Sequence, residues 1–215
     1  MNNPISTELE QFIIASILGD GHIRPSANRK KARIAYSHSK AQKEYIFWKY
    51  EFLKEYGLSV SPPRHIYVGD RKQFEQYRFT TKTDEIFMKY YDMLYETSKK
   101  KLTRKALNKL GALGLAIWYM DDGNLSLQKY TKTDGTRGIH SRRLMLNTQG
   151  FSYEENQLIQ RYFKVVWDID TTINRDKSYY RITMGAISAN KLIEIIEPYI
   201  QPELYYKIDM QYKRK

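Results

Sequence analysis

The sequence has no cysteine, few histidines and no long apolar run. Without cysteine there are no disulfides, thiolate nucleophiles or sulfur-bound zinc sites, and the four histidines form no HExxH pattern. Any bound metal therefore needs oxygen ligands. The longest apolar stretches, such as FIIASILG at 12–19, are far shorter than the roughly 20 residues that span a bilayer. No cationic start followed by an apolar signal core opens the chain. We expect a soluble, intracellular protein that is not secreted and does not contact a membrane.

The charge of the chain is strongly positive. Lys and Arg number 36 against 24 Asp and Glu, which gives a net charge of +12 and a pI near 9.6. The hydrophobic content of 41% is that of a globular protein with a core. This balance favours a polyanionic partner, although charge alone leaves nucleic acid and an anionic membrane surface both open.

Hydrophobic periodicity predicts the same order of elements twice: helix, strand, strand, helix, strand, strand, helix. Thr7 and Glu10 fit a capping box at the start of the first helix. In the first half we expect helices over 8–19, 40–57 and 84–97, a first strand within the strand-loop-strand segment 22–33, and strands over 29–39, 64–70 and 72–81. In the second half we expect helices over 105–120, 152–167 and 186–199 and strands over 125–130, 142–148, 170–176 and 179–184. Residues 98–105 form a short basic connector, so the two halves should pack closely.

An acid followed by glycine ends the first helix of each half. Asp20 and Asp122 lie 102 residues apart, and small residues such as Ala15 and Gly114 lie where two helices could touch. Each pair alone could be a simple helix C-cap. Two pairs in phase with a repeat favour helices packed side by side, which would bring the two carboxylates together. Such carboxylates repel unless a cation lies between them, and with nearby carbonyls they form the ligand set that Mg²⁺ prefers.

At these residues the chain resembles the LAGLIDADG homing endonucleases, in particular their single-chain branch with two motif copies. IIASILGDG (13–21) and LAIWYMDDG (115–123) are similar to the two nine-residue motifs, and AQKEY, LNTQGFSYEE and PYIQPELYYKI are similar to stretches that follow them. The resemblance implies an α+β fold of two pseudo-symmetric αββαββα halves with saddle-shaped antiparallel sheets and a central two-helix interface. We place the halves at residues 1–100 and 101–215.

The resemblance also implies an active site. Asp20 and Asp122 occupy the catalytic eighth position of each motif, and they are our metal ligands, with the main-chain carbonyls of Gly19 and Asp121 as helpers. Two or more Mg²⁺ ions are expected, and Mn²⁺ or Ca²⁺ could substitute for binding. One basic residue per active site is implied, which would be Lys207 and Lys100, although Lys99 or Lys101 would fit after a one-residue shift.

Basic strand-loop-strand segments follow both motifs, and a two-stranded ribbon fits the major groove of DNA. From them and the later strands we predict a DNA-binding set that consists of Arg24, Arg29, Lys30, Lys31, Arg33, Gln76, Arg78, Lys129, Lys132, Arg137, Arg142, Arg181 and Thr183. The halves carry unequal charge, which predicts a long asymmetric site. Because one chain holds two copies of every part, we expect a monomer.

Three functions are compatible with these features. The first is a site-specific endonuclease that hydrolyses both strands of DNA with a divalent metal. The second is a group I intron RNA maturase on the same fold, which would bind intron RNA and need no paired acids. The third is a non-cleaving DNA-binding regulator, which the presence of both acids disfavours. The protein is expected in the compartment of its target genome, an organelle matrix or a bacterial or phage cytoplasm.

Overall fold

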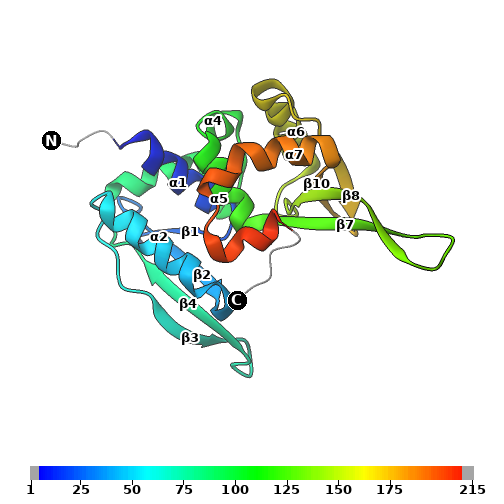
Figure 1. Ribbon diagram of the computed structural model, residues 1–215. Coiled ribbons are helices and arrows are strands. Elements are labelled where there is room, and N and C mark those ends of the chain that lie inside the picture. Colours follow the sequence, from blue (N-terminus) through cyan, green and yellow to red (C-terminus); the bar gives the residue numbers. More distant parts are fainter. Residues whose placement is uncertain (1–4, 210–215) are drawn as a thin grey trace.

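The computed structural model of the protein describes residues 5–209, without the side chains of 127–130 and 137–141. Two halves with the same order of elements lie side by side (Figure 1). The first half contains α1 (Thr7–Leu18), β1 (His22–Pro25), β2 (Ala32–Ser39), α2 (Lys43–Glu55), β3 (Arg64–Val68), β4 (Phe74–Thr80) and α3 (Met88–Leu94). The second contains α5 (Ala112–Asp122), β7 (Gly123–Thr131), β8 (Arg137–Leu146), α6 (Tyr153–Trp167), β9 (Thr172–Asp176), β10 (Tyr179–Met184) and α7 (Ala186–Ile196).

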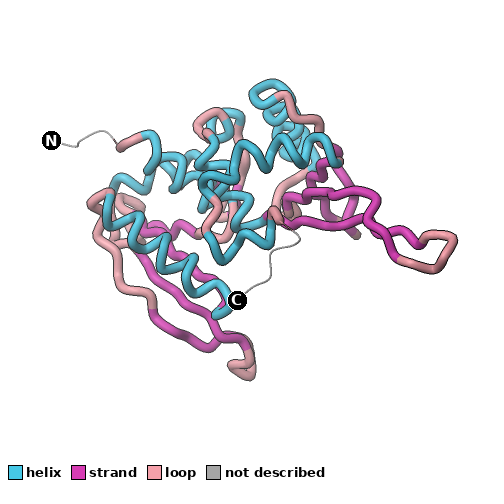
Figure 2. Tube along the Cα trace, viewed as in Figure 1, coloured by secondary structure: helices cyan, strands magenta, loops and turns pink. Residues whose placement is uncertain are grey.

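Each half has one four-stranded antiparallel sheet, and the strand order is equivalent in both. The orders are β1-β2-β4-β3 and β7-β8-β10-β9. Helices α1 and α5 pack against each other at the centre, and the sheets flank them (Figure 2). The predicted α+β fold with a central helix pair is therefore confirmed. The boundary at residue 100 stays a prediction.

The core joins the halves through the apolar faces of α1 and α5. Phe12 of α1 stacks on Phe52 of α2 with ring centroids 4.4 Å apart, and Tyr36 of β2 stacks on Phe79 of β4 at 4.8 Å. Both sheets bury one face under helices, as half-buried antiparallel sheets do. Their other faces stay open. Within the described residues, no helix is long and apolar enough to cross a membrane.

Several predicted boundaries were wrong. The first helix is capped by Ser6, whose side chain accepts from the Leu9 amide, so the expected box at Thr7 does not form. The helix expected over 105–120 is two helices, α4 (Arg104–Leu107) and α5, because Gly111 takes an extended conformation as the N-cap of α5. The helix expected over 84–97 begins with a 3-10 turn (Glu85–Phe87).

The segment expected to be a plain connector contains structure of its own. A short hairpin of β5 (Tyr95–Glu96) and β6 (Lys99–Lys100) precedes α4. Short 3-10 turns also lie at Lys40–Gln42, Glu197–Tyr199 and Pro202–Lys207. The hairpin and the last turn matter for function, because each places one lysine at a motif helix end.

Candidate active site

The ends of the two motif helices touch. A Cβ atom added to Gly19 would lie 2.5 Å from the Cβ of Asp121, so these backbones could not approach so closely with a larger residue there. Gln11 of α1 reinforces the interface, since its side-chain oxygen accepts from the amides of Gly111 at 2.8 Å and Gly114 at 3.1 Å. The close approach expected from the small residues is thus present at both ends of the helix pair.

Asp20 and Asp122 lie at this junction, and their surroundings oppose ionisation. Burial first, and then the charge of Asp121, raise the pKa of Asp20 to about 6. Burial raises the pKa of Asp122 to about 7, with the charges of Asp121 and Asp20 adding to the effect. Carboxylates with raised pKa values are typical of active sites. The other possible metal ligands at this junction are main-chain carbonyl oxygens. Carboxylates together with carbonyl oxygens fit a hard divalent cation such as Mg²⁺.

Lys100 and Lys207 hold equivalent positions in the two halves. The Lys100 ammonium donates to the carbonyl of Gly19 at 2.5 Å, and that of Lys207 donates to Met120 at 2.5 Å and to Asp121 at 3.3 Å. Burial lowers the pKa of both lysines, while the nearby aspartates oppose that shift. Each lysine therefore places its ammonium group at the end of one motif helix.

Of the three candidate lysines in the connector, the structure brings only Lys100 to the junction. Lys99 is exposed, and the ammonium of Lys101 lies 3.9 Å from Glu96. A cavity of about 290 Å³ opens beside Lys100, and it is lined by Gly19 and Asp122 among others. Gly19, whose carbonyl accepts from Lys100, therefore lines this cavity together with Asp122.

Sequence reasoning missed a buried charged cluster next to Asp20. The Asp121 carboxylate and the Lys49 ammonium are both 0% exposed, and their atoms lie 2.7 and 2.9 Å apart. The Tyr45 hydroxyl donates to Asp121 at 2.8 Å. Burial opposes ionisation of Asp121, but Lys49 and these hydrogen bonds hold its pKa below the usual value. One feature of the sequence could have indicated this cluster, because Lys49 lies on the same buried face of α2 as Tyr45, Ile46 and Leu53.

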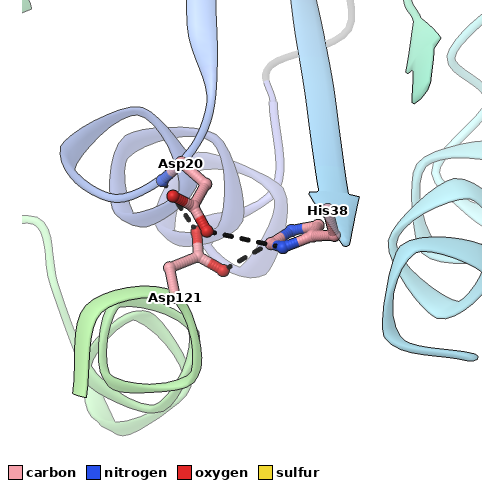
Figure 3. Close-up of side chains that lie close together, drawn as sticks. All are labelled: Asp20, His38 and Asp121. Carbon is pink, nitrogen blue, oxygen red and sulfur yellow. Dashed lines mark hydrogen bonds and ion pairs between the residues drawn. The ribbon is translucent and has the colours of Figure 1, made fainter. Parts of the chain in front are cut away.

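His38 completes this cluster (Figure 3). Its Nδ1 lies 3.4 Å from an oxygen of Asp20, and its Nε2 lies 3.8 Å from Asp121. Burial, and then the charge of Lys49, lower the pKa of His38 to about 3, so the ring is neutral at pH 7. Ligand atoms of the three residues lie within 4.8 Å of one another, as in a metal site. However, the Lys49 ammonium already contacts both oxygens of Asp121 and neutralises the carboxylate, which leaves it a poor ligand for a metal ion. We therefore assign Asp121 to the ion pair.

The open face of the first sheet is basic. The register places Arg24 opposite Arg33 and Arg78 opposite Arg64, and residues directly opposite in an antiparallel pair share a face. Gln76 lies two residues before Arg78 and thus on the same face. The four arginines are exposed. Arg64 was not among the predicted DNA contacts, although it is the first residue of the strand expected over 64–70.

The loop between β1 and β2 carries the remaining predicted bases of the first half. Arg29, Lys30 and Lys31 are all exposed. Arg29 has a φ of 54° in this turn, and its guanidinium lies 5.2 Å from the centre of the Tyr91 ring. The turn therefore holds three cations at the edge of the open face.

The second sheet agrees less well with the predicted contacts. The register of β8 places Arg142 on the same face as the buried Leu144, whereas Arg143 shares the open face with Arg181 and Thr183. Thr183 is only 7% exposed and its hydroxyl donates to Asn174, which does not favour it as a DNA contact. Lys132 is exposed. The side chains of Lys129 and Arg137 lie outside the described residues.

Fold and site together define a two-half protein with one paired acidic centre under two open, basic sheets. The LAGLIDADG DNA endonuclease family matches residues 10–192. The chain belongs to this family.

Known relatives cover nearly the whole chain. DNA endonuclease I-ChuI of Chlamydomonas applanata is 27% identical over 95% of both chains. The cytochrome b mRNA maturase bI2 of Saccharomyces cerevisiae is 28% identical over 97% of this chain and 49% of its own length. Among solved structures, the homing endonuclease I-WcaI bound to its DNA recognition sequence superimposes with a TM-score of 0.82 at 24% identity, over 97% of this chain and 88% of that one. This likeness shows that the fold is shared.

Proposed function

We propose that this chain is a site-specific endonuclease that cuts both strands of a long, asymmetric DNA site. The observation that carries the proposal is the junction of α1 and α5, where two aspartates with raised pKa values meet and each helix end is contacted by one lysine, half-buried Lys100 or buried Lys207. The family and the relatives named DNA endonucleases support it. Since the chain carries two complete halves, we propose that it acts as a monomer.

In this proposal Asp20 and Asp122 hold divalent ions, with the carbonyls of Gly19 and Asp121 as further donors. Bound Mg²⁺ would stabilise negative charge at the scissile phosphate and activate water. A carbonyl oxygen has two lone pairs, so each can accept from its lysine and still face an ion. Lys100 and Lys207 would place positive charge beside the phosphate, where water is partly excluded and such charge is most effective.

The basic open faces would bind the DNA. Arginines paired across strands can contact base edges in the major groove, and the cations of the β1–β2 loop can contact phosphates. The target sequence can be found by incubating the protein with a randomised DNA library and Mg²⁺ and sequencing the cut ends.

The first prediction concerns Asp122→Asn. This change removes a charged metal ligand but preserves shape, so double-strand cutting of the selected site should be abolished while binding to the site is retained. Plasmid linearisation measures cutting, and gel-shift titration measures binding. Asp92→Asn, an exposed residue of α3, is the matched control and should cut normally. Normal linearisation by Asp122→Asn would show that the assignment is wrong.

A second candidate function is an intron RNA maturase, which the similarity to the maturase bI2 favours. Splicing activity would not need the paired carboxylates. A variant with both Asp20→Asn and Asp122→Asn that still promotes splicing of its own intron RNA would establish this activity separately from DNA cutting.

A further inference from the structure

The two motif aspartates are held in place by different means. Asp122 is the last residue of α5, and the helix continues through it, because the Gly123 amide donates to the carbonyl of Tyr119. By contrast, α1 ends at Leu18, so Asp20 lies beyond the helix. The amide of Asp20 donates to the Asp121 carboxylate of the other half at 3.3 Å. The turn around Asp20 is also closed by the Gly21 amide, which donates to the Ser16 carbonyl at 2.6 Å, but the amide of Asp20 itself is held by a side chain of the other half.

Asp121 is itself fixed from the first half. Both carboxylate oxygens contact the Lys49 ammonium, and one also accepts from Tyr45. The Lys49 ammonium lies 4.7 Å from the centre of the Tyr45 ring, which also favours a cation there. Lys49 and Tyr45 are on successive turns of α2, so one helix sets the position of the carboxylate. Buried polar groups with every partner in place are rigid.

The residues that correspond to Asp121 and His38 in the other half carry no charge. Gly19 occupies the position in the first motif that Asp121 occupies in the second, and it cannot carry a side chain, because a Cβ there would lie 2.6 Å from an oxygen of Asp121. The registers of the two sheets make Thr148 the counterpart of His38. Thr148 donates to the buried Asn156 at 2.5 Å, with no charge involved.

We infer that Asp121 is a positioning residue for Asp20, held in place by Lys49 and Tyr45, and that among the described residues no side chain supports the Asp122 backbone in this way. This inference rests on the proposed nuclease function. In the proposed nuclease each strand of the duplex would be cut beside a different combination of these groups, so the two strands should depend unequally on Asp121. The side chain of Asp121 acts through the Asp20 backbone and does not need to touch DNA or metal.

Two double variants distinguish the positioning role of Asp121 from the effects of losing the buried charges and of changing the packing. Lys49→Met with Asp121→Asn removes both buried charges but keeps an amide oxygen that can accept from the Asp20 amide. Lys49→Met with Asp121→Leu removes the charges and the acceptor together. The assay measures the first-order cleavage rate of each strand in a duplex labelled on both strands. We expect the leucine variant to change the ratio of the two rates by about tenfold or more, as small misplacements of reacting groups do. The asparagine variant should keep a ratio near that of the unmodified protein.

The melting temperature and the affinity for uncut DNA are measured for both variants, so that a loss of folding or of DNA binding is distinguished from a change in the strand ratio. Equal slowing of both strands, or equal ratios in the two variants, would overturn the inference while the nuclease function stands. If the unmodified protein cuts neither strand, the proposed function fails and this inference fails with it. If either double variant does not fold, Tyr45→Phe decides the matter, because it removes one hydrogen bond to Asp121 and keeps the ring. A shifted strand ratio in Tyr45→Phe supports the inference, and an unchanged ratio overturns it.

Discussion

Replacing Lys49 by methionine is expected to lower the free energy of unfolding by about 3 to 5 kcal/mol, which is the usual cost of removing one partner from a buried ion pair. The structure places this site at the high end of that range. Asp121 is 0% exposed, so its charge would be left without water, and it would keep only the hydrogen bonds from Tyr45 and Asp20. Because whole domains are stable by only about 5 to 15 kcal/mol, the loss is large.

A double-mutant cycle with Asp121→Leu tests the reasoning. Asp121→Leu alone leaves the Lys49 ammonium buried without a partner and should cost a similar amount. The variant with both changes removes both charges, and the remaining cost is about 1 to 3 kcal/mol for the Tyr45 hydroxyl, which then lacks its acceptor. The two single losses should therefore sum to several kcal/mol more than the loss in the double variant.

Urea unfolding followed by tryptophan fluorescence measures all three variants. The matched control is Lys54→Met in the same helix, since Lys54 pairs with Glu51 at 2.9 Å but both side chains are about half exposed. Exposed pairs contribute about 1 kcal/mol or less. The reasoning would be refuted by a Lys49→Met loss no larger than that of Lys54→Met, or by additive losses in the cycle.

Three further predictions concern DNA, protons and assembly. Removing Arg29, Lys30 and Lys31 together should reduce the slope of log K against log salt by about 0.9 for each DNA phosphate that these side chains neutralise, and an unchanged slope in binding titrations would place the DNA elsewhere. Without divalent ions, the folded protein keeps protons on Asp20 and Asp122 up to pH values of about 6 and about 7, whereas unfolded carboxyls release them near pH 4. Stability to urea should therefore fall as pH rises from about 4 to about 7; a variant with both acids changed to asparagine should lack this decline, and an equal decline in both proteins would contradict the pKa shifts. Light scattering should find one chain per DNA duplex, and mixing Asp20→Asn with Asp122→Asn protein should restore no double-strand cutting, whereas two chains per duplex or restored cutting would exclude a monomer.

The sequence by itself determined the repeat and the place of the motif acids. Helices such as 152–167 and strands such as 179–184 were predicted almost to the residue, because side-chain periodicity and the capping residue Ser152 are local properties. The acid and glycine that end each motif helix also lie within a few residues. Their repetition sufficed to place Asp20 and Asp122 together at one helix pair.

The broken helix at Gly111 and the choice of Lys100 among three lysines were decided by tertiary structure. Gly111 starts a new helix where its amide meets Gln11, 100 residues earlier in the chain. The hairpin of β5 and β6 orients Lys100 toward Gly19. Sequence periodicity predicts neither contact, because these partners lie far apart along the chain and meet only when the halves pack.

The buried cluster at Asp121 was also decided by the tertiary structure. Two adjacent aspartates in the second motif look interchangeable in the sequence, yet Asp122 lines the cavity beside Lys100 and Asp121 is paired with Lys49 and Tyr45. A helix turns by about 100° per residue, so neighbouring side chains point in different directions. Which of them meets a lysine is set by how α2 packs against α5, and that packing exists only in the folded protein.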